Sequence, residues 1–298
     1  MGVATSHEFL IPRARKRGPN VVAMPIVAQQ AEIFAANRAR GRIALTVASA
    51  EGATRRARVV EEGSLRVRFP GPRSRDLTAL LVNTAGGIAG GDRFDLDVEV
   101  GAQARLVVTG AAAEKIYRSL GPEAVIDVRL KVGTDGLLCW LPQETILFDQ
   151  ARLRRTIDID LSSEATLILA EALVFGRAAM RESVRTGRVL DRWRVRIGGT
   201  LRLAETLRLD GAIADRLAEP AVAAGGAAIA SMLLVPADDE KVAALEALRP
   251  RFRGEVAASA WNGLALARFV AKDGWALRHD LVAALTGLGV PLPPLWLA

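Results

Sequence analysis

The feature that most restricts how this chain can fold is a unit that recurs four times: an amphipathic run, a turn of glycine or small polar residues, and a second apolar run. The turns begin at Gly101, Gly133, Ser162 and Gly198. Apolar and polar residues alternate with a period of two, which predicts β-strands with one apolar face. One such hairpin cannot bury its apolar face alone, whereas several stacked hairpins form a continuous core. We therefore predict a mainly β fold of stacked, layered antiparallel sheets, either irregular and β-helix-like or a sandwich.

The polar faces of these strands carry rows of charged residues. The rows are Asp95, Asp97 and Glu99; Asp127, Arg129 and Lys131; Asp158 and Asp160; and Arg192, Arg194 and Arg196. Charged rows of this kind hinder pairing between the edges of different sheets. We expect all four rows to face solvent.

A glycine-rich stretch from Asn83 to Asp92 separates an apolar run from an alternating one. Its four glycines are Gly86, Gly87, Gly90 and Gly91. A phosphate-binding loop needs a lysine and a Ser or Thr after the last glycine, where this chain has Asp92. A cyclase-like Gly-Gly-Asp-x-Phe hairpin needs an acidic residue at Arg93, and a calcium-binding glycine-aspartate repeat needs tandem copies. We interpret the stretch as a connection between two strands, in which Asp92 caps amides of the loop.

After residue 226 the pattern changes to alternating strands and helices. We predict a strand over 227–235, a helix capped by Asp238, and a hairpin around Asn262-Gly263. Asp273 is expected to cap a second helix. The apolar residues of the first helix are Val242, Leu245 and Leu248, and those expected to face inward in the second are Trp275, Leu281 and Leu285. The two helices would cover one end of the sheets.

The first 40 residues do not follow the strand pattern. They contain a basic cluster from Arg13 to Arg17, and their pattern indicates a short helix over 28–40. We predict a partly flexible arm over residues 1–40. Residues 41–298 would form a single β-rich domain, whose portion from about 238 to 298 is helical.

Composition argues against several classes of site. Cys139 is the only cysteine and lies in an apolar run, so we interpret it as a buried small hydrophobic residue. The only histidines, His7 and His279, have no local ligand partners, which argues against a self-contained zinc site and against histidine acid–base chemistry. The sequence shows neither a signal-peptide pattern nor an apolar run of membrane-spanning length. We expect a soluble, cytoplasmic protein without membrane contacts.

The net charge of +7 and a preference for arginine over lysine favour contacts with acidic groups. Genome-driven use of arginine explains the excess equally well. A basic nucleic-acid-binding β protein is the main alternative function, although aromatic residues are only 5% of the chain and offer few stacking platforms. A hydrolase or lyase on a β-helical scaffold is a second alternative, and it would need carboxylates at chemical distance.

Four stretches of the chain match one known family in order and spacing. They are LVNTAGGIAGGD over 81–92, AEKIYRS over 113–119, WLPQETILFD over 140–149 and EALVFGR over 171–177. On these stretches the sequence resembles the urease accessory protein family UreD, called UreH in some organisms, over roughly residues 41–298. Many members have a proline before the first glycine pair, where this chain has Thr84-Ala85, a departure that concerns the stiffness of the loop.

The resemblance implies a mostly β protein with helices near its C-terminus. It implies a scaffold that docks on apo-urease and recruits the helical accessory protein UreF and the nickel-carrying GTPase UreG, so that nickel enters the urease active site. It also implies no catalytic residues, no turnover and no permanently bound cofactor, with nickel at most in transit. The residues agree with this, because the chain has no phosphate-binding loop, two histidines and one cysteine.

Three acidic residues within the matching stretches are candidates for lining an internal nickel path: Glu144, Asp149 and Glu171. Each lies in a largely apolar segment, where a buried carboxylate is costly unless it is paired or hydrated. Oxygen ligands alone bind a divalent ion weakly enough to release it. The alternative is a satisfied ion pair, for example Glu171 with Arg177 or Glu144 with Arg118.

Tyr117 and Arg118 are a candidate anchor for a partner interface. Tyr117 is the only tyrosine of the chain, and both residue types are favoured at the centres of interfaces. A core tyrosine beside a paired arginine is the alternative.

Overall fold

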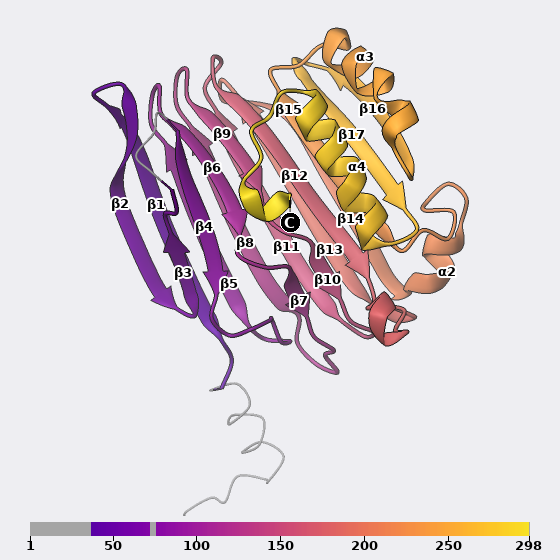
Figure 1. Ribbon diagram of the computed structural model, residues 1–298. Helices are drawn as coiled ribbons and strands as arrows, with labels where there is room; N and C mark the ends of the chain where they lie inside the picture. The colour runs from indigo at the N-terminus through magenta and orange to yellow at the C-terminus, as the bar shows by residue number, and fades with distance from the viewer. Residues whose placement is uncertain (1–36, 72–75, 298) are drawn as a thin grey trace, which may run out of the picture. The chain divides into compact units, whose positions relative to one another are not determined.

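The computed structural model describes residues 37–71 and 76–297. By its contacts the chain divides into residues 1–37 and 38–298, and the fold described below is that of the second unit (Figure 1). The arm predicted over 1–40 and its helix over 28–40 lie almost entirely outside the described residues. The first strand already begins at Arg40.

One sheet of the fold has seven strands. Across the sheet they are β14 (Thr200–Ala212), β13 (Thr186–Ile197), β11 (Arg152–Leu161), β8 (Ala124–Val132), β5 (Arg93–Val100), β1 (Arg40–Ala50) and β2 (Ala53–Gly63). The strands from β13 to β1 are all parallel to their neighbours. The two outermost strands, β14 and β2, each pair antiparallel through a hairpin.

The second sheet has ten strands. Across the sheet they are β16 (Glu255–Trp261), β17 (Leu264–Ala271), β15 (Ala228–Val235), β12 (Thr166–Phe175), β9 (Leu137–Leu141), β6 (Arg105–Gly110), β4 (Leu77–Asn83) and β3 (Leu65–Arg68). Two short strands lie off this path: β10 (Thr145–Leu147) pairs with β12, and β7 (Glu114–Ile116) pairs with β10. The strands β12, β9, β6 and β4 are parallel, and β3, β15, β17 and β16 pair antiparallel.

The turns at Gly101, Gly133 and Ser162 carry the chain from the first sheet to the second. The first amide of each turn also donates to a carbonyl of the neighbouring strand in the first sheet, as Gly133 does to Val100 at 2.8 Å. The prediction of a mainly β, layered and β-helix-like fold is therefore confirmed, but the prediction of antiparallel pairing is wrong for these units. Alternation reports only that a strand has one buried face, so it cannot distinguish a hairpin from a turn that crosses between sheets. Only the unit at Gly198 is an antiparallel hairpin.

The main core lies between the two sheets. The inward faces of the first sheet stack in register, for example Leu96 beside Val128, Val128 beside Ile157, and Ile157 beside Trp193. These side chains are all buried. The core is therefore a set of aligned apolar rows, as the strand patterns predict.

The charged rows lie on the outer face of the first sheet, exposed or half-buried as predicted. Parallel pairing in register makes the sign alternate across the strands: Asp97, Arg129, Asp158 and Arg194 are successive neighbours, as are Glu99, Lys131, Asp160 and Arg196. Arg129 pairs with Asp97, and Lys131 pairs with Glu99 at 3.3 Å. Much of the positive charge of this face is therefore balanced locally.

Both predicted C-terminal helices are present. α3 (Asp239–Ala247) is capped by Asp238, and α4 (Gly274–Gly287) is capped by Asp273, whose carboxylate accepts from the amide of Ala276 at 2.8 Å. A short helix, α2 (Ile213–Ala218), and the 3-10 turns η1 (Ala178–Met180), η2 (Arg249–Arg251) and η3 (Pro294–Trp296) were not predicted. None of the helices in the described ranges is long and apolar enough to span a membrane.

α4 lies across the outer face of the second sheet, over β15 and β17, and buries a second core there (Figure 1). Leu281 and Leu285 face this core as predicted. The inward prediction for Trp275 is wrong, since this residue is 66% exposed. At about 100° per residue, a position six residues before Leu281 points well away from the face that Leu281 buries.

Candidate functional site

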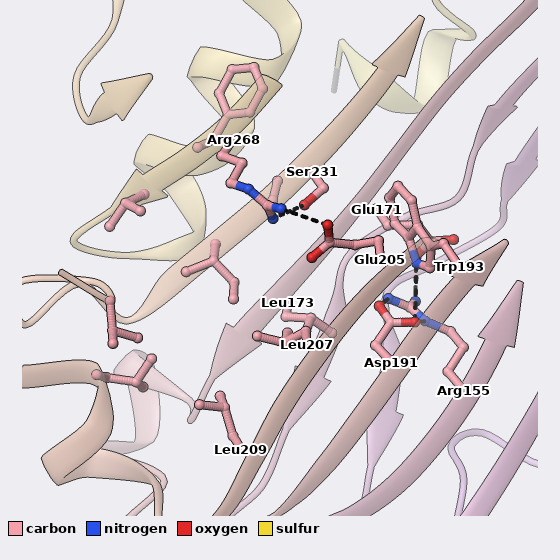
Figure 2. A pocket seen from close by; sticks show the side chains of 16 residues that line it. Arg155, Glu171, Leu173, Asp191, Trp193, Glu205, Leu207, Leu209, Ser231 and Arg268 are labelled. Carbon is pink, nitrogen blue, oxygen red and sulfur yellow. Dashed lines mark hydrogen bonds and ion pairs between the residues drawn. The ribbon is translucent and has the colours of Figure 1, made fainter. Parts of the chain in front are cut away.

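A buried ionic triad lies between the two sheets. Arg155 of β11 and Asp191 of β13 belong to the first sheet, and Glu171 of β12 belongs to the second (Figure 2). Nε and Nη2 of Arg155 donate to the two carboxylate oxygens of Asp191 at 3.1 and 2.6 Å, and Nη1 donates to Glu171. The two remaining donors are indoles: Trp140 to Glu171 at 2.8 Å and Trp193 to Asp191 at 3.2 Å.

Burial and charge act against each other in this triad. Burial lowers the pKa of Arg155, but the carboxylates of Asp191 and Glu171 outweigh it, so the pKa lies above the ordinary value for arginine. Burial raises the pKa of Glu171 above its ordinary value, although Arg155 and Trp140 act in the opposite direction. The triad therefore holds one permanent cation between two carboxylates, a costly arrangement that is stable only when every member is paired.

A cavity of about 140 Å³ reaches the triad from one side. Arg155, Glu171 and Asp191 form its inner end, and Leu173, Leu207 and Leu209 line its walls (Figure 2). At its solvent side, Arg268 of β17 pairs with Glu205 of β14 at 2.8 Å. Because β17 and β14 belong to different sheets, this ion pair links the two sheets across the mouth of the cavity.

A larger cavity of about 550 Å³ reaches the same triad from the other side. It is also lined by Arg155 and Glu171, and most of its wall is apolar. Its polar wall includes Glu114, which accepts from Nδ2 of Asn83 at 2.9 Å, and burial raises the pKa of Glu114. The two cavities therefore share two side chains of the triad and no others.

Gln143 adds an unsatisfied donor to the larger cavity. Its side chain is buried, and Arg278 of α4 donates to its Oε1 at 2.8 Å. Its Nε2 has no hydrogen-bond partner among the described residues. Arg278 thus occupies the amide oxygen of Gln143, and the amide nitrogen of Gln143 can still donate a hydrogen bond into the cavity.

Of the three acidic candidates, only Glu171 lines either cavity. Its partner is Arg155 and not the suggested Arg177, which instead pairs with Glu182 at 2.6 Å. Glu144 pairs with Arg278 at 2.7 Å and not with the suggested Arg118. Arg155 and Glu171 meet across the two sheets, whereas Glu144 meets Arg278 because α4 packs on the second sheet.

Asp149 holds a loop in place. Its Oδ1 accepts from the amides of Arg185 and Thr186 at 2.8 and 3.1 Å, and its Oδ2 pairs with the Arg185 side chain at 3.3 Å. Burial acts to raise the pKa of Asp149, but these amides and Arg185 outweigh it, so the pKa lies below the ordinary value. The structure therefore places Asp149 at a loop anchor outside the two cavities.

The glycine-rich stretch connects β4 of the second sheet to β5 of the first. Asp92 accepts from the amides of Ala89 and Ala39 at 2.7 and 2.8 Å. Gly86 and Ile88 line the larger cavity, so this connection forms part of its wall. Gly90 lies against Ser119 and Pro122, and Gly91 lies against Arg38 and Pro122, so a side chain at either position would meet neighbouring atoms.

Tyr117 is half-buried beside the glycine-rich stretch. Its hydroxyl donates to the carbonyl of Gly86 at 3.0 Å, its ring meets that of Phe148 edge to face, and it lies directly against Gly87. Arg118 is exposed. Tyr117 therefore has a packing role in this structure, while Arg118 is accessible to a partner.

Sequence reasoning missed Arg155, Asp191, Glu114 and Gln143. The first two carry a signal that could have been used, because each interrupts an inward apolar series, as Arg155 does between Leu153 and Ile157. Glu114 and Gln143 lie in short segments without a clear period. No group of three or more His, Cys, Asp or Glu side chains in the described part of the chain is placed to hold a metal ion.

Comparisons with known proteins agree on one family. A family model described as UreD urease accessory protein matches residues 39–294. The urease accessory protein UreD of Rhodopseudomonas palustris strain BisB5 is 55% identical over 268 residues, 90% of this chain and 95% of that protein. The UreD of strain BisA53 is 54% identical over 95% of this chain and 99% of its own length. The urease accessory protein UreD 3 of Bradyrhizobium sp. strain BTAi1 is 53% identical over 90% of this chain and 96% of its own length.

Proposed function

Because the chain belongs to the UreD family of urease accessory proteins, we propose that it serves urease maturation as a scaffold that performs no chemistry of its own. It docks on apo-urease in the cytoplasm and recruits the helical UreF and the GTPase UreG, so that nickel reaches the urease active site. The single observation that supports this most is the meeting of two cavities at one buried ion pair, Arg155 with Glu171. An interior with this arrangement suits a passing cation better than a resident one.

The nickel ion in this proposal is cargo. Glu114, Glu171 and Asp191 offer carboxylate oxygens along the two cavities, and oxygen ligands hold a divalent ion without the affinity of thiolate or imidazole sites. At the triad, Arg155 occupies the space between two of these carboxylates. A cation that passes from one cavity to the other would therefore have to displace the guanidinium of Arg155 while it is close to the carboxylates.

The path is tested by changing its carboxylates one at a time. Glu114→Gln and Glu171→Gln keep the shape of the side chain and remove its charge, so we expect several-fold less nickel in urease purified from cells that carry either variant. Glu144→Gln and Asp149→Asn are matched controls, since these residues hold Arg278 and a loop and line neither of the two cavities. The measurement is nickel per urease by mass spectrometry, with thermal unfolding as a check on folding.

Equal nickel contents for wild type, Glu114→Gln and Glu171→Gln, with normal stability, would remove both residues from the path. A loss confined to the Glu144 and Asp149 variants would place the path elsewhere. The scaffold itself is tested separately, by co-expressing a tagged chain with the urease subunits and the other accessory proteins. We expect urease and at least one accessory protein to co-purify, and the isolated chain to hydrolyse neither urea nor GTP.

Binding to nucleic acid is a less suitable function for this fold. On the outer face of the first sheet, Arg93 pairs with Asp127 and Arg129 pairs with Asp97, so acidic neighbours balance the cations. Phosphate binding needs cations without such partners. The hydrolase alternative is also weakened, because Glu171 and Asp191 both bind one guanidinium and neither is placed as a separate acid or base.

A further inference from the structure

The outward face of α4 carries an exposed tryptophan. Trp275 lies in the first turn of the helix and is 66% exposed, whereas a large aromatic side chain is ordinarily mostly buried. The guanidinium of Arg253 stacks on its indole, 3.8 Å from the ring centre. Stacked arginine and tryptophan are the residue types that most often anchor protein–protein interfaces.

A groove of about 480 Å³ runs from Trp275 along the same face of α4. Val282, Ala283 and Trp296 contribute its apolar floor, and the exposed Leu297 stands at its edge. Its polar rim consists of Arg251, Arg278, His279 and Thr286. From Trp275 to Thr286 the groove follows about 16 Å of helix, or three turns, which is the length over which one further helix can pack.

The charge beside this groove is positive and comes from three arginines around η2. Arg249, Arg251 and Arg253 follow one another around η2, all exposed, and none of them forms an ion pair within the part of the chain that the structure describes. Two carboxylates close to the groove already have partners. Asp280 is buried and accepts from the amides of Arg253 and Gly254 at 2.8 Å each, and Glu144 binds Arg278. This contrasts with the first sheet, where arginines alternate with acids.

We propose that this face of α4 docks an acidic amphipathic helix of a protein partner. Apolar side chains at intervals of three and four residues enter the groove beside Trp275, and Asp or Glu side chains of the same helix reach the arginines of η2. The apolar floor and the exposed Leu297 favour a protein over a nucleic acid, whose backbone offers nothing for them to bury. Arg278 lies on the rim and also holds Gln143, so the docked helix would lie one side chain from the larger cavity.

This inference rests on the proposed function only in its choice of probe, which is the set of urease subunits and accessory proteins co-expressed with a tagged chain. Trp275→Ala and Arg253→Glu are expected to weaken capture of one of these proteins at least about tenfold, as for a central interface residue. Arg253→Lys should weaken this capture less than Arg253→Glu does, because the positive charge remains. Trp261→Ala is the matched control. Trp261 is another exposed tryptophan, but it lies in the second sheet at the β16–β17 hairpin, away from the groove.

A second experiment identifies the partner segment directly. A photo-reactive amino acid placed at Thr286, an exposed rim position, should crosslink to an acidic helical segment of the urease protein whose capture the two variants weaken. Undiminished capture by both Trp275→Ala and Arg253→Glu overturns the docking surface and leaves the proposed function intact. Crosslinking to nucleic acid, or to a basic or non-helical segment, also overturns it. If the wild-type chain captures none of the urease proteins, both the docking surface and the proposed function are contradicted.

Discussion

Replacing Arg155 by methionine is expected to lower the free energy of unfolding by about 3–5 kcal/mol, the typical cost of removing one member of a buried ionic group. The substitution leaves the carboxylates of Glu171 and Asp191 buried between the sheets without their shared cation. The indoles of Trp140 and Trp193 would be their remaining donors, and these are neutral. Urea-induced unfolding monitored by tryptophan fluorescence measures the effect.

The control for this prediction is the adjacent residue of the same strand. Arg154 points to the outer face of the first sheet, where its side chain is 32% exposed and lies 3.6 Å from Asp127. Arg154→Met should lower the free energy of unfolding by about 1 kcal/mol or less, as is typical when one partner of a surface ion pair is removed. The combined change of Arg155, Glu171 and Asp191 to apolar residues should recover much of the loss, because it removes the unpaired charges together. Equal costs for Arg154→Met and Arg155→Met would contradict the assignment of Arg155 as the cation of the triad.

The second large effect that we expect is that of Gly90→Val. This substitution should lower the free energy of unfolding by about 3 kcal/mol or more, at the upper end of the range for overpacked positions. A Cβ at Gly90 would lie 2.0 Å from Oγ of Ser119 and 2.5 Å from the carbonyl oxygen of Pro122. The hydroxyl of Ser119 is itself held by that carbonyl at 2.7 Å, and the carbonyl belongs to the backbone. The glycine-rich stretch would have to shift, and with it one wall of the larger cavity.

Gly121→Ala is the matched control in the neighbouring loop. A Cβ at Gly121 would meet no atom within 4 Å, so the substitution should change stability by about 0.5 kcal/mol or less. Urea-induced unfolding compares the two variants, and capture of the urease proteins shows whether the shift reaches the partner surfaces. If Gly90→Val folded with wild-type stability, the close packing of this loop against Ser119 and Pro122 would be wrong.

Much of the secondary structure follows from local chemistry. Alternation marks the strands because each has one buried face, and Asp238 and Asp273 mark the helix starts because their carboxylates accept from the first free amides. Asn262-Gly263 marks a hairpin because both residues adopt positive φ, which a two-residue turn of this kind requires. The family resemblance, which depends on four short stretches, is confirmed by a family model that spans residues 39–294.

The stacking of the sheets could not be predicted in the same way. A turn that crosses between sheets and a hairpin bury the same alternating pattern, so the parallel order of β5, β8 and β11 is decided by contacts between strands that are far apart in the sequence. The strand pattern also leaves open the pairing of Arg155 with Glu171, which crosses between the sheets, and that of Glu144 with Arg278, which joins a loop of the second sheet to α4. Both ion pairs depend on how the strands and α4 pack in three dimensions, which local periodicity does not determine.

Nickel per urease active site is the most direct measure of whether this chain delivers metal to another protein. Urease is purified from cells that co-express the remaining urease proteins with the wild-type chain, with Glu171→Gln, or without the chain, and its nickel is determined by mass spectrometry. We expect a full complement of nickel with the wild type, several-fold less with Glu171→Gln, and almost none without the chain. Urease that contains its full nickel in cells lacking the chain would contradict the proposed role in metal delivery.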